Sequence, residues 1–322
     1  MEELHKSLYR TLRRIREFEG QVVSLVEKNL IYGVAHEYIG QEAVATGVCS
    51  ALEDRDILTS THRGHGHVLA KGADPSRMMA ELLGRETGLN RGRGGSMHVA
   101  DVSRGIYGAN GIVGAGAPIA VGAAFAARAR GEDAVAVPFF GDGALNQGVV
   151  MEAMNMAALW RLPMVFVCEN NGYAVSLPVD AAVAGDPVKR ARAMGMNAER
   201  VDGMDVLKVR EAAVAAVERA RSGGGPTFIE CTTYRFRGHH TAEAVMRLDY
   251  RSSAEIEQWQ TRDPLGIQGA RLEPADRQRI DSEIEAEIAA AVKFAEESPK
   301  PDASTAYDHM YSSGLVARQG VS

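Results

Sequence analysis

Two short polar motifs in this 322-residue sequence carry the residue types of a hard-metal site. One is Gly141-Asp142-Gly143, directly after the apolar run 134–140; the other is Asn170-Asn171, after the apolar run 163–168. A carboxylate, an amide oxygen and a main-chain carbonyl form an oxygen site of low charge, which suits Mg²⁺ once phosphate oxygens and water complete its octahedron. A helix beginning after Gly143 would point its N-terminal N–H groups at the same anion. The motifs therefore predict a magnesium and phosphate site.

The elements that must position these motifs alternate along the chain. Short apolar runs bounded by polar residues predict buried strands, and 3.6-residue periodicity predicts helices between them. We expect strands at about 56–60, 134–140, 163–168 and 227–231, and helices at about 40–52, 64–71, 75–83, 117–130, 147–160, 205–221, 253–262 and 273–297. This alternation predicts an α/β fold, a mostly parallel sheet with helices on both faces. The carboxyl ends of parallel strands share one edge, so Asp142 and Asn171 should converge there.

Glycine is concentrated in one segment. Ten of the 34 glycines fall between positions 84 and 116, too many for a helix or strand interior. Loops of this length are usually functional or disordered, and Ile106, Tyr107, Ile112 and Val113 argue against disorder. We expect a long loop shaped to approach a ligand closely.

The domain organisation follows from the same patterns. Residues 1–33 predict an amphipathic N-terminal helix, residues 34–250 the α/β domain, and residues 251–322 a C-terminal helical appendage with charged faces.

Composition excludes several classes of partner. The 36 basic and 42 acidic residues give a net charge of −6 without a basic block, so neither nucleic acid nor a membrane surface is an expected partner. We expect a cytoplasmic protein, because no signal peptide and no long uncharged apolar run is present. Cys49, Cys168 and Cys231 are too widely spaced for a local zinc motif and are expected to be reduced core thiols.

The spacing of the two polar motifs resembles a family signature. Residues 144 to 169, 26 in number, separate Gly143 from Asn170, as in thiamine-diphosphate enzymes. Five further blocks, at 38–43, 61–66, 94–98, 110–115 and 234–239, resemble the alpha subunits of 2-oxo acid and acetoin dehydrogenase complexes. The resemblance covers roughly residues 5 to 265 and implies the thiamine-diphosphate-binding fold.

The resemblance implies a role for each matching residue. Magnesium would be held by Asp142, Asn171 and the Tyr173 carbonyl; the cofactor by Gly143, Ala144, Arg63, His62, Gly111, Val113 and His239. Within that set the backbones of Gly143 and Ala144 would contact the diphosphate, and those of Gly111 and Val113 the aminopyrimidine. For Val113, the alternative of a core valine predicts the same side-chain burial, so only the backbone contact distinguishes the two interpretations. The matching histidines on the substrate side, with catalytic roles, are His239, His65 and His36.

The implied chemistry requires partners. Thiamine diphosphate adds to a small-molecule carbonyl substrate, and the acyl group is oxidatively transferred to a lipoyl-bearing acyltransferase. In the family the glutamate that activates the cofactor lies on a beta subunit, in a heterotetramer of two alpha and two beta chains. Glu152 and Glu169 are expected to be committed to positions beside the metal, so the chain alone should turn over nothing.

Departures from the family bear on the substrate. Mitochondrial pyruvate-specific relatives carry Tyr where this chain has His62, and the run 62–67 looks more like acetoin dehydrogenase alpha subunits. His240 replaces a phosphorylatable serine, and the loop 241–249 lacks the usual Asp-Pro pair. Acetoin is therefore favoured, with pyruvate or a branched-chain 2-oxo acid still open.

Three other hypotheses fit parts of the sequence. A nicotinamide-dependent oxidoreductase is suggested by Gly111, Gly114 and Gly116, but Ile119 breaks that fingerprint. A metallohydrolase would use the histidines at 62, 65 and 67, although Arg63 would repel a divalent metal. A subunit that has lost its activity is opposed by the intact metal and diphosphate residues.

Overall fold

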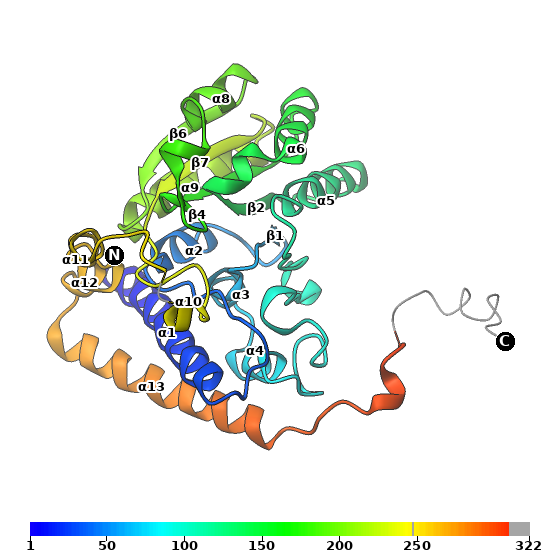
Figure 1. Ribbon diagram of the computed structural model, residues 1–322. Helices are drawn as coiled ribbons and strands as arrows, with labels where there is room; N and C mark the ends of the chain where they lie inside the picture. Colours follow the sequence, from blue (N-terminus) through cyan, green and yellow to red (C-terminus); the bar gives the residue numbers. More distant parts are fainter. Residues whose placement is uncertain (247, 309–322) are drawn as a thin grey trace.

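The computed structural model describes residues 1–246 and 248–308, and its centre is one parallel sheet (Figure 1). The strands are β1 (Ile57–Thr59), β2 (Ala136–Gly141), β3 (Val165–Asn170), β6 (Asn197–Asp202) and β7 (Thr227–Thr232). Their order is β1-β2-β3-β7-β6, and every pairing is parallel. The expected parallel α/β fold is confirmed.

Helices cover both faces of the sheet, because the side chains of each strand point alternately to the two faces and both faces are apolar. On β2, Val137 and Phe139 join one core cluster and Ala136 and Phe140 join the other. The helices α2 (Glu42–Cys49) and α9 (Val206–Arg221) pack in the first cluster; α5 (Gly116–Arg130) and α6 (Gly148–Leu159) pack in the second.

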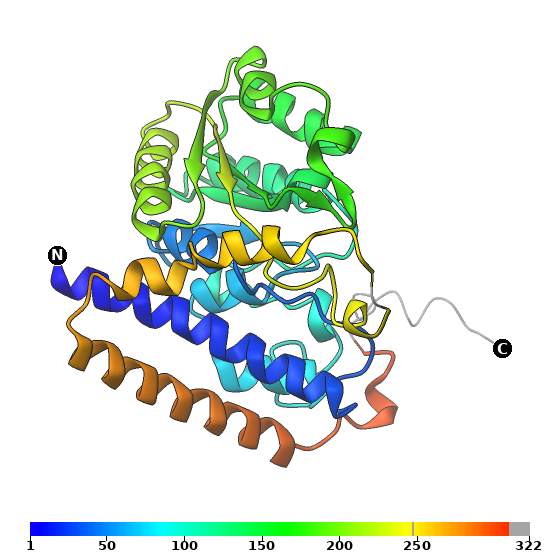
Figure 2. The ribbon, with the colours of Figure 1, turned by 60° about the vertical axis from the view of Figure 1, so that its left-hand side comes forward.

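The long helices α1 (Glu2–Glu27) and α13 (Pro274–Glu297) lie side by side at the edge of the molecule (Figures 1 and 2). Their hydrogen-bonded pairs keep a nearly constant offset of 268 to 273 residues, so the two helices run parallel. Arginines of α1 face acids of α13, as in the pair Arg13–Glu285 at 2.8 Å. Ile280, Ile284 and Ile288 of α13 are buried in the same cluster as α2 and α9, so the described part of the C-terminal segment adds to the main core.

The remaining described elements are shorter. They are α3 (His65–Ala70), α4 (Pro75–Leu82), α7 (Val179–Ala182), α8 (Pro187–Ala193), α10 (Glu243–Met246), α11 (Ser253–Gln260), α12 (Pro264–Gly269), the strands β4 (Tyr173–Ala174) and β5 (Leu177–Pro178), and the single turns η1 (Gly95–Met97), η2 (Val102–Arg104), η3 (Asp142–Asn146) and η4 (Ala303–Thr305). Residues 309–322 of the predicted appendage, and Arg247 in the 241–249 loop, lie outside the described residues.

The glycine-rich segment is a long loop, as predicted, and a buried carboxylate organises it. Glu81 on α4 accepts hydrogen bonds from the backbone N–H groups of Asn90, Gly92, Gly94 and Gly95, at 2.7 to 3.1 Å. A Cβ on Gly88 would lie 2.4 Å from a Glu81 carboxylate oxygen, so this position needs glycine.

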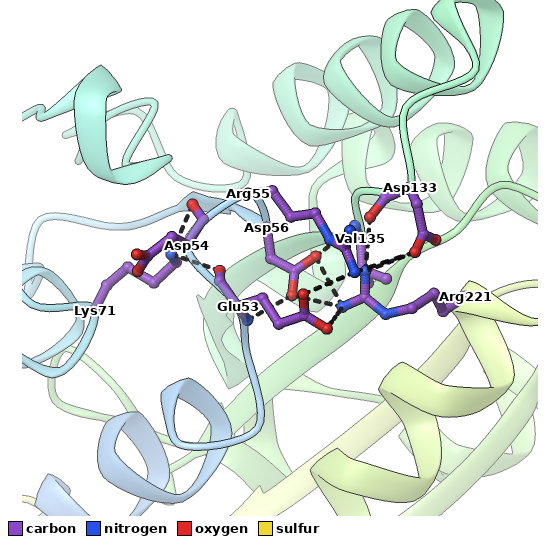
Figure 3. A network of polar contacts seen from close by, with 8 residues as sticks. All are labelled: Glu53, Asp54, Arg55, Asp56, Lys71, Asp133, Val135 and Arg221. Atoms are coloured by element: carbon purple, nitrogen blue, oxygen red, sulfur yellow. Dashed lines mark hydrogen bonds and ion pairs between the residues drawn. The ribbon is translucent and has the colours of Figure 1, made fainter.

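A network of charges closes the amino ends of β1 and β2 (Figure 3). The Asp56 carboxylate, fully buried, accepts hydrogen bonds from the N–H groups of Val135 and Glu53, both at 2.8 Å, and from the Arg221 guanidinium. Arg221 also donates to the Asp133 carbonyl at 2.7 Å. Within residues 1–246 and 248–308, none of the helices has the length and apolar character that crossing a bilayer requires.

Candidate cofactor and metal site

A cavity of about 370 Å³ opens at the carboxyl ends of β1, β2 and β3. Four segments supply most of its wall: 60–63 after β1, 110–116 of the glycine-rich loop, 141–144 after β2, and 169–175 after β3. The rest of the wall comes from other parts of the chain: His36, Gln41, Met97, Phe139, Gln147 and His239. This is the edge at which open α/β sheets bind ligands.

Asp142 and Asn171 meet in this cavity. The Asp142 carboxyl is buried, and its Oδ2 has no hydrogen-bond partner among the described residues. Burial raises the pKa of Asp142 to about 6, although backbone groups of Asp142, Asn171 and Gly143 act in the opposite direction. A buried carboxylate oxygen without a partner is costly, and a bound cation would satisfy it.

Gln41 fixes the Asn171 amide. The Asn171 Nδ2 donates to the Gln41 Oε1 at 2.9 Å. Asn171 Oδ1 accepts only a long hydrogen bond, 3.2 Å, from the Tyr173 N–H. Tyr173 lines the cavity while its hydroxyl is tied to Glu255 at 2.9 and 3.0 Å. The oxygens of these residues have the chemistry that a hard divalent cation requires.

The residues after β2 fit an anion beside that cation. At Gly143 a Cβ would lie 2.9 Å from the Ala174 Cβ, so a side chain there would crowd the cavity wall. The helix expected to begin directly after Gly143 does not: η3 intervenes, and α6 begins at Gly148. The N–H groups nearest the metal motif therefore belong to the tight η3 turn rather than to a long helix.

Arg63 supplies the positive charge of the cavity. Its guanidinium donates to the carbonyls of Glu37, at 2.5 Å, and His239, at 3.0 Å. Burial, with the charge of Arg235, lowers the pKa of Arg63 to about 10, which leaves it charged at neutral pH. A planar guanidinium held in this way suits a diphosphate.

The glycine-rich loop contributes Gly111 and Val113 to the rim. Val113 is 43% exposed, so the buried side chain that both interpretations predict is not found, and the exposure does not decide between them. A Cβ on Gly111 would come no closer than 3.7 Å to any other part of the described chain, its nearest neighbour being the His98 ring. Any steric need for glycine at 111 therefore comes from outside these residues.

Three histidines gather at the cavity. The ring centroid of His36 lies 4.7 Å from that of His62 and 4.9 Å from that of His239. The ring centroids of His62 and His239 are 5.2 Å apart. Burial, reinforced by Arg63, lowers the pKa of His36 to about 3 and those of His62 and His239 to about 2. All three rings are neutral at physiological pH, so they offer one N–H and one lone pair each.

Comparison with known proteins identifies the family. The model of the family described as dehydrogenase E1 component matches residues 10–304. The chain belongs to this family. It is 46% identical over 310 residues to the alpha subunit of the acetoin:2,6-dichlorophenolindophenol oxidoreductase of Bacillus subtilis, covering 94% of this chain and 92% of that one. It is 44% identical to the Cupriavidus necator protein of the same name, over 92% and 90% of the two chains. The pyruvate dehydrogenase E1 alpha subunit of Zymomonas mobilis is 42% identical, over 96% and 88%.

E1 components are thiamine-diphosphate-dependent dehydrogenases, so the expected dependence on thiamine diphosphate is confirmed for the family. The structure does not support two of the other hypotheses, the nicotinamide-dependent oxidoreductase and the metallohydrolase. No strand of the described residues directly precedes the segment 111–116, as a dinucleotide fingerprint requires. Of the three histidines in the metallohydrolase hypothesis, only His62 faces the cavity, because His65 and His67 are turned into the core.

The structure of this E1 chain corrects the position of His65. Its ring is fully buried, bonds Glu19 through Nδ1 at 3.0 Å and Ser96 through Nε2 at 2.9 Å, and is not part of the described cavity wall. Burial opposes its protonation, but the Glu19 carboxylate outweighs burial and raises the pKa of His65. Helix α3 begins at His65 and turns this side chain toward α1, a direction that sequence does not give.

The two acids near the metal motif, Glu152 and Glu169, lie in different places in the structure. Glu152 is exposed on α6 and lines a different groove, so the expectation that it lies beside the metal is wrong. Glu169 does line the cavity, where the Tyr38 hydroxyl and the His67 Nε2, at 3.2 Å, hold its Oε1. Gln41 was not predicted, although its membership in the block 38–43 was a usable signal.

Proposed function

We propose that this chain is the alpha subunit of a thiamine-diphosphate- and magnesium-dependent acetoin dehydrogenase. The observation that carries the proposal is the convergence of Asp142, Asn171 and Arg63 on one cavity. An unpartnered buried carboxylate next to a fixed guanidinium suits a cation bound to an anionic tail.

Each residue of the wall has a role in this proposal. Asp142, the Asn171 amide oxygen and the Tyr173 carbonyl hold Mg²⁺. The backbones of Gly143 and Ala144 and the Arg63 guanidinium bind the diphosphate, and the backbones of Gly111 and Val113 bind the aminopyrimidine. His62, on the same cavity wall, also contacts the cofactor.

When bound, thiamine diphosphate supplies the carbanion and the electron sink that carbon–carbon cleavage requires. This chain orients the substrate and moves protons. The neutral imidazoles of His36, His62 and His239 can each donate one hydrogen bond and accept another, so they suit a hydroxyl and a carbonyl. Arg63 is too firmly bound to the Glu37 and His239 carbonyls to leave the diphosphate side.

The proposal includes a beta subunit, in a heterotetramer of two alpha and two beta chains. The carboxylates in the described cavity wall are Asp142 and Glu169. The first is assigned to the metal, and the second is held by Tyr38 and His67. A partner must therefore supply the carboxylate that activates the pyrimidine ring. The exposed side chains of Ile112 and Val113 at the rim offer that partner an apolar contact.

Acetoin is the proposed substrate, and a lipoyl-bearing acyltransferase the proposed acyl acceptor. Support comes from the names of the relatives at 46% and 44% identity and from an imidazole at His62 in a cavity of neutral histidines. Pyruvate is the second candidate, supported by the relative at 42% identity; a branched-chain 2-oxo acid is a more distant alternative.

The test is co-purification with a beta subunit, followed by reduction of 2,6-dichlorophenolindophenol with acetoin, pyruvate and branched-chain 2-oxo acids in turn. We expect turnover with acetoin, dependent on magnesium and thiamine diphosphate, and none from the alpha chain alone. A higher kcat/KM for pyruvate would transfer the assignment to pyruvate. Turnover by the isolated chain would contradict the two-subunit proposal.

A further inference from the structure

The ring nitrogens of three histidines, His36, His62 and His239, converge in the cavity. One ring nitrogen of each residue lies within 4.8 Å of the corresponding nitrogen of the other two. The residues come from three separate segments, before α2, after β1 and after β7, so the cluster is made by the fold. The His36 Nδ1 is buried and has no hydrogen-bond partner among the described residues.

Three converging imidazoles are ligands for a borderline-soft divalent cation. Zinc binds imidazole nitrogen at about 2.0–2.1 Å in a tetrahedron, which places ligand nitrogens about 3.4 Å apart. Nitrogens already within 4.8 Å of one another need only small ring movements to reach that geometry. Three histidines leave a fourth position for water or an anion.

The charge around the cluster decides which cations are accepted. The Arg63 guanidinium contacts the His239 Nδ1 at hydrogen-bond distance, 3.4 Å, and the charges of Arg63 and Arg235 both oppose a cation at the three rings. The carboxylates of Glu37, Glu169 and Glu19 interact favourably with Arg63 and offset part of its charge. Magnesium prefers oxygen and has little affinity for imidazole, whereas zinc, copper and nickel bind imidazole well. The histidine cluster and the Asp142 site therefore select different metals.

We propose that His36, His62 and His239 form a second metal site, which takes an imidazole-preferring divalent cation such as Zn²⁺. Because the same rings face the cavity, an occupied site excludes the substrate and inhibits the enzyme reversibly. The inhibitory consequence rests on the proposed function; the binding itself does not.

Binding is tested with Co²⁺ as a coloured substitute for Zn²⁺. The chelator-treated complex with its beta subunit is titrated with Co²⁺, with Mg²⁺ in excess. We expect the strong visible absorption of tetrahedral cobalt, saturating at one ion per alpha chain and abolished by one equivalent of Zn²⁺. Each of His36→Gln, His62→Gln and His239→Gln should weaken binding roughly tenfold or more, since even outer-shell changes have effects of this size.

Two matched controls separate this site from its neighbours. His98→Gln changes an exposed histidine outside the cluster, and Asp142→Asn changes the proposed magnesium ligand; both should retain the cobalt spectrum. Weak octahedral absorption, or affinity retained in the three cluster variants, overturns the proposal. Loss of the spectrum in Asp142→Asn alone also overturns it, by placing the ion at the magnesium site.

Inhibition is measured independently of binding. Zn²⁺ added to the wild-type complex preloaded with thiamine diphosphate should raise the KM for acetoin, with activity restored by a chelator. A KM for acetoin that Zn²⁺ does not change would overturn the inhibitory role. If the complex does not oxidise acetoin at all, the proposed function fails, while the cobalt titration still decides whether the histidines bind metal.

Discussion

The two ends of the same parallel strands are built in opposite ways. At the amino ends, the Asp56 carboxylate is surrounded by donors of this chain, from Val135, Glu53 and Arg221 (Figure 3). At the carboxyl ends, Asp142 and His36 each have a buried polar atom without a partner among the described residues.

This difference separates stability from function. A buried charge destabilises a fold unless a partner compensates it, and at Asp56 the chain supplies that partner itself. At Asp142 the described residues supply no hydrogen-bond partner for Oδ2, and a cavity lies beside the carboxylate. A ligand is the remaining source of compensation, so changes at the two ends should affect different measurements.

The largest effect is expected from Asp142→Asn. Removing the charge should weaken magnesium-dependent cofactor binding by more than about a hundredfold, as measured by calorimetry on the complex. The unfolding temperature of the ligand-free chain should stay the same or rise, because the raised pKa of Asp142 means that its ionised form costs stability at neutral pH. Unchanged affinity would remove Asp142 from the metal site.

Asp56→Ala tests the opposite end. It leaves Arg221 and the Val135 N–H without their buried acceptor, and should lower the free energy of unfolding by about 3 kcal/mol, measured by urea denaturation. Cofactor affinity should be unchanged well below the unfolding temperature. As a control, Arg55→Gln removes an exposed ion pair of the same network and should cost less than about 1 kcal/mol. Equal costs would show that burial is not what distinguishes Asp56.

Gln41→Met removes the acceptor that orients the Asn171 amide while keeping similar volume. With the amide free to rotate, we expect metal affinity to fall about 10- to 100-fold, measured by Mn²⁺ titration. Gln41→Glu keeps an acceptor and should lose less. If Gln41→Met binds Mn²⁺ as the wild type does, the amide needs no positioning residue.

The smallest effect is a pH dependence of stability. In the folded chain, burial lowers the pKa values of His36, His62 and His239. Near pH 6.5 the unfolded chain therefore binds protons on these residues and the folded chain does not. Stability of the ligand-free chain should therefore fall as pH decreases from 7.5 to 5.5. His65, whose pKa is raised, acts in the opposite direction. The double variant His62→Gln/His239→Gln should flatten the decline seen in thermal unfolding; an unchanged slope would contradict the assignment.

The sequence predicted the features that depend on pattern. Apolar runs identified four of the five strands of the main sheet, and parallel topology brought Asp142 and Asn171 together as expected. The edge strand β6 was missed because Asn197, Glu199 and Arg200 interrupt any apolar run. The direction of a side chain at a helix start was also inaccessible, which is why His65 was placed on the substrate side.

The pairing of α1 with α13 has a consequence for synthesis. The helix α13 packs against both α1 and α4, so the surfaces that it covers stay exposed until almost the whole chain has left the ribosome. Closure between segments about 270 residues apart is slow, because it must overcome the entropy of a very long loop. A nascent chain arrested before α13 would expose the helical surface that α13 covers in the folded chain. A chaperone or a partner subunit could bind that surface before α13 is synthesised.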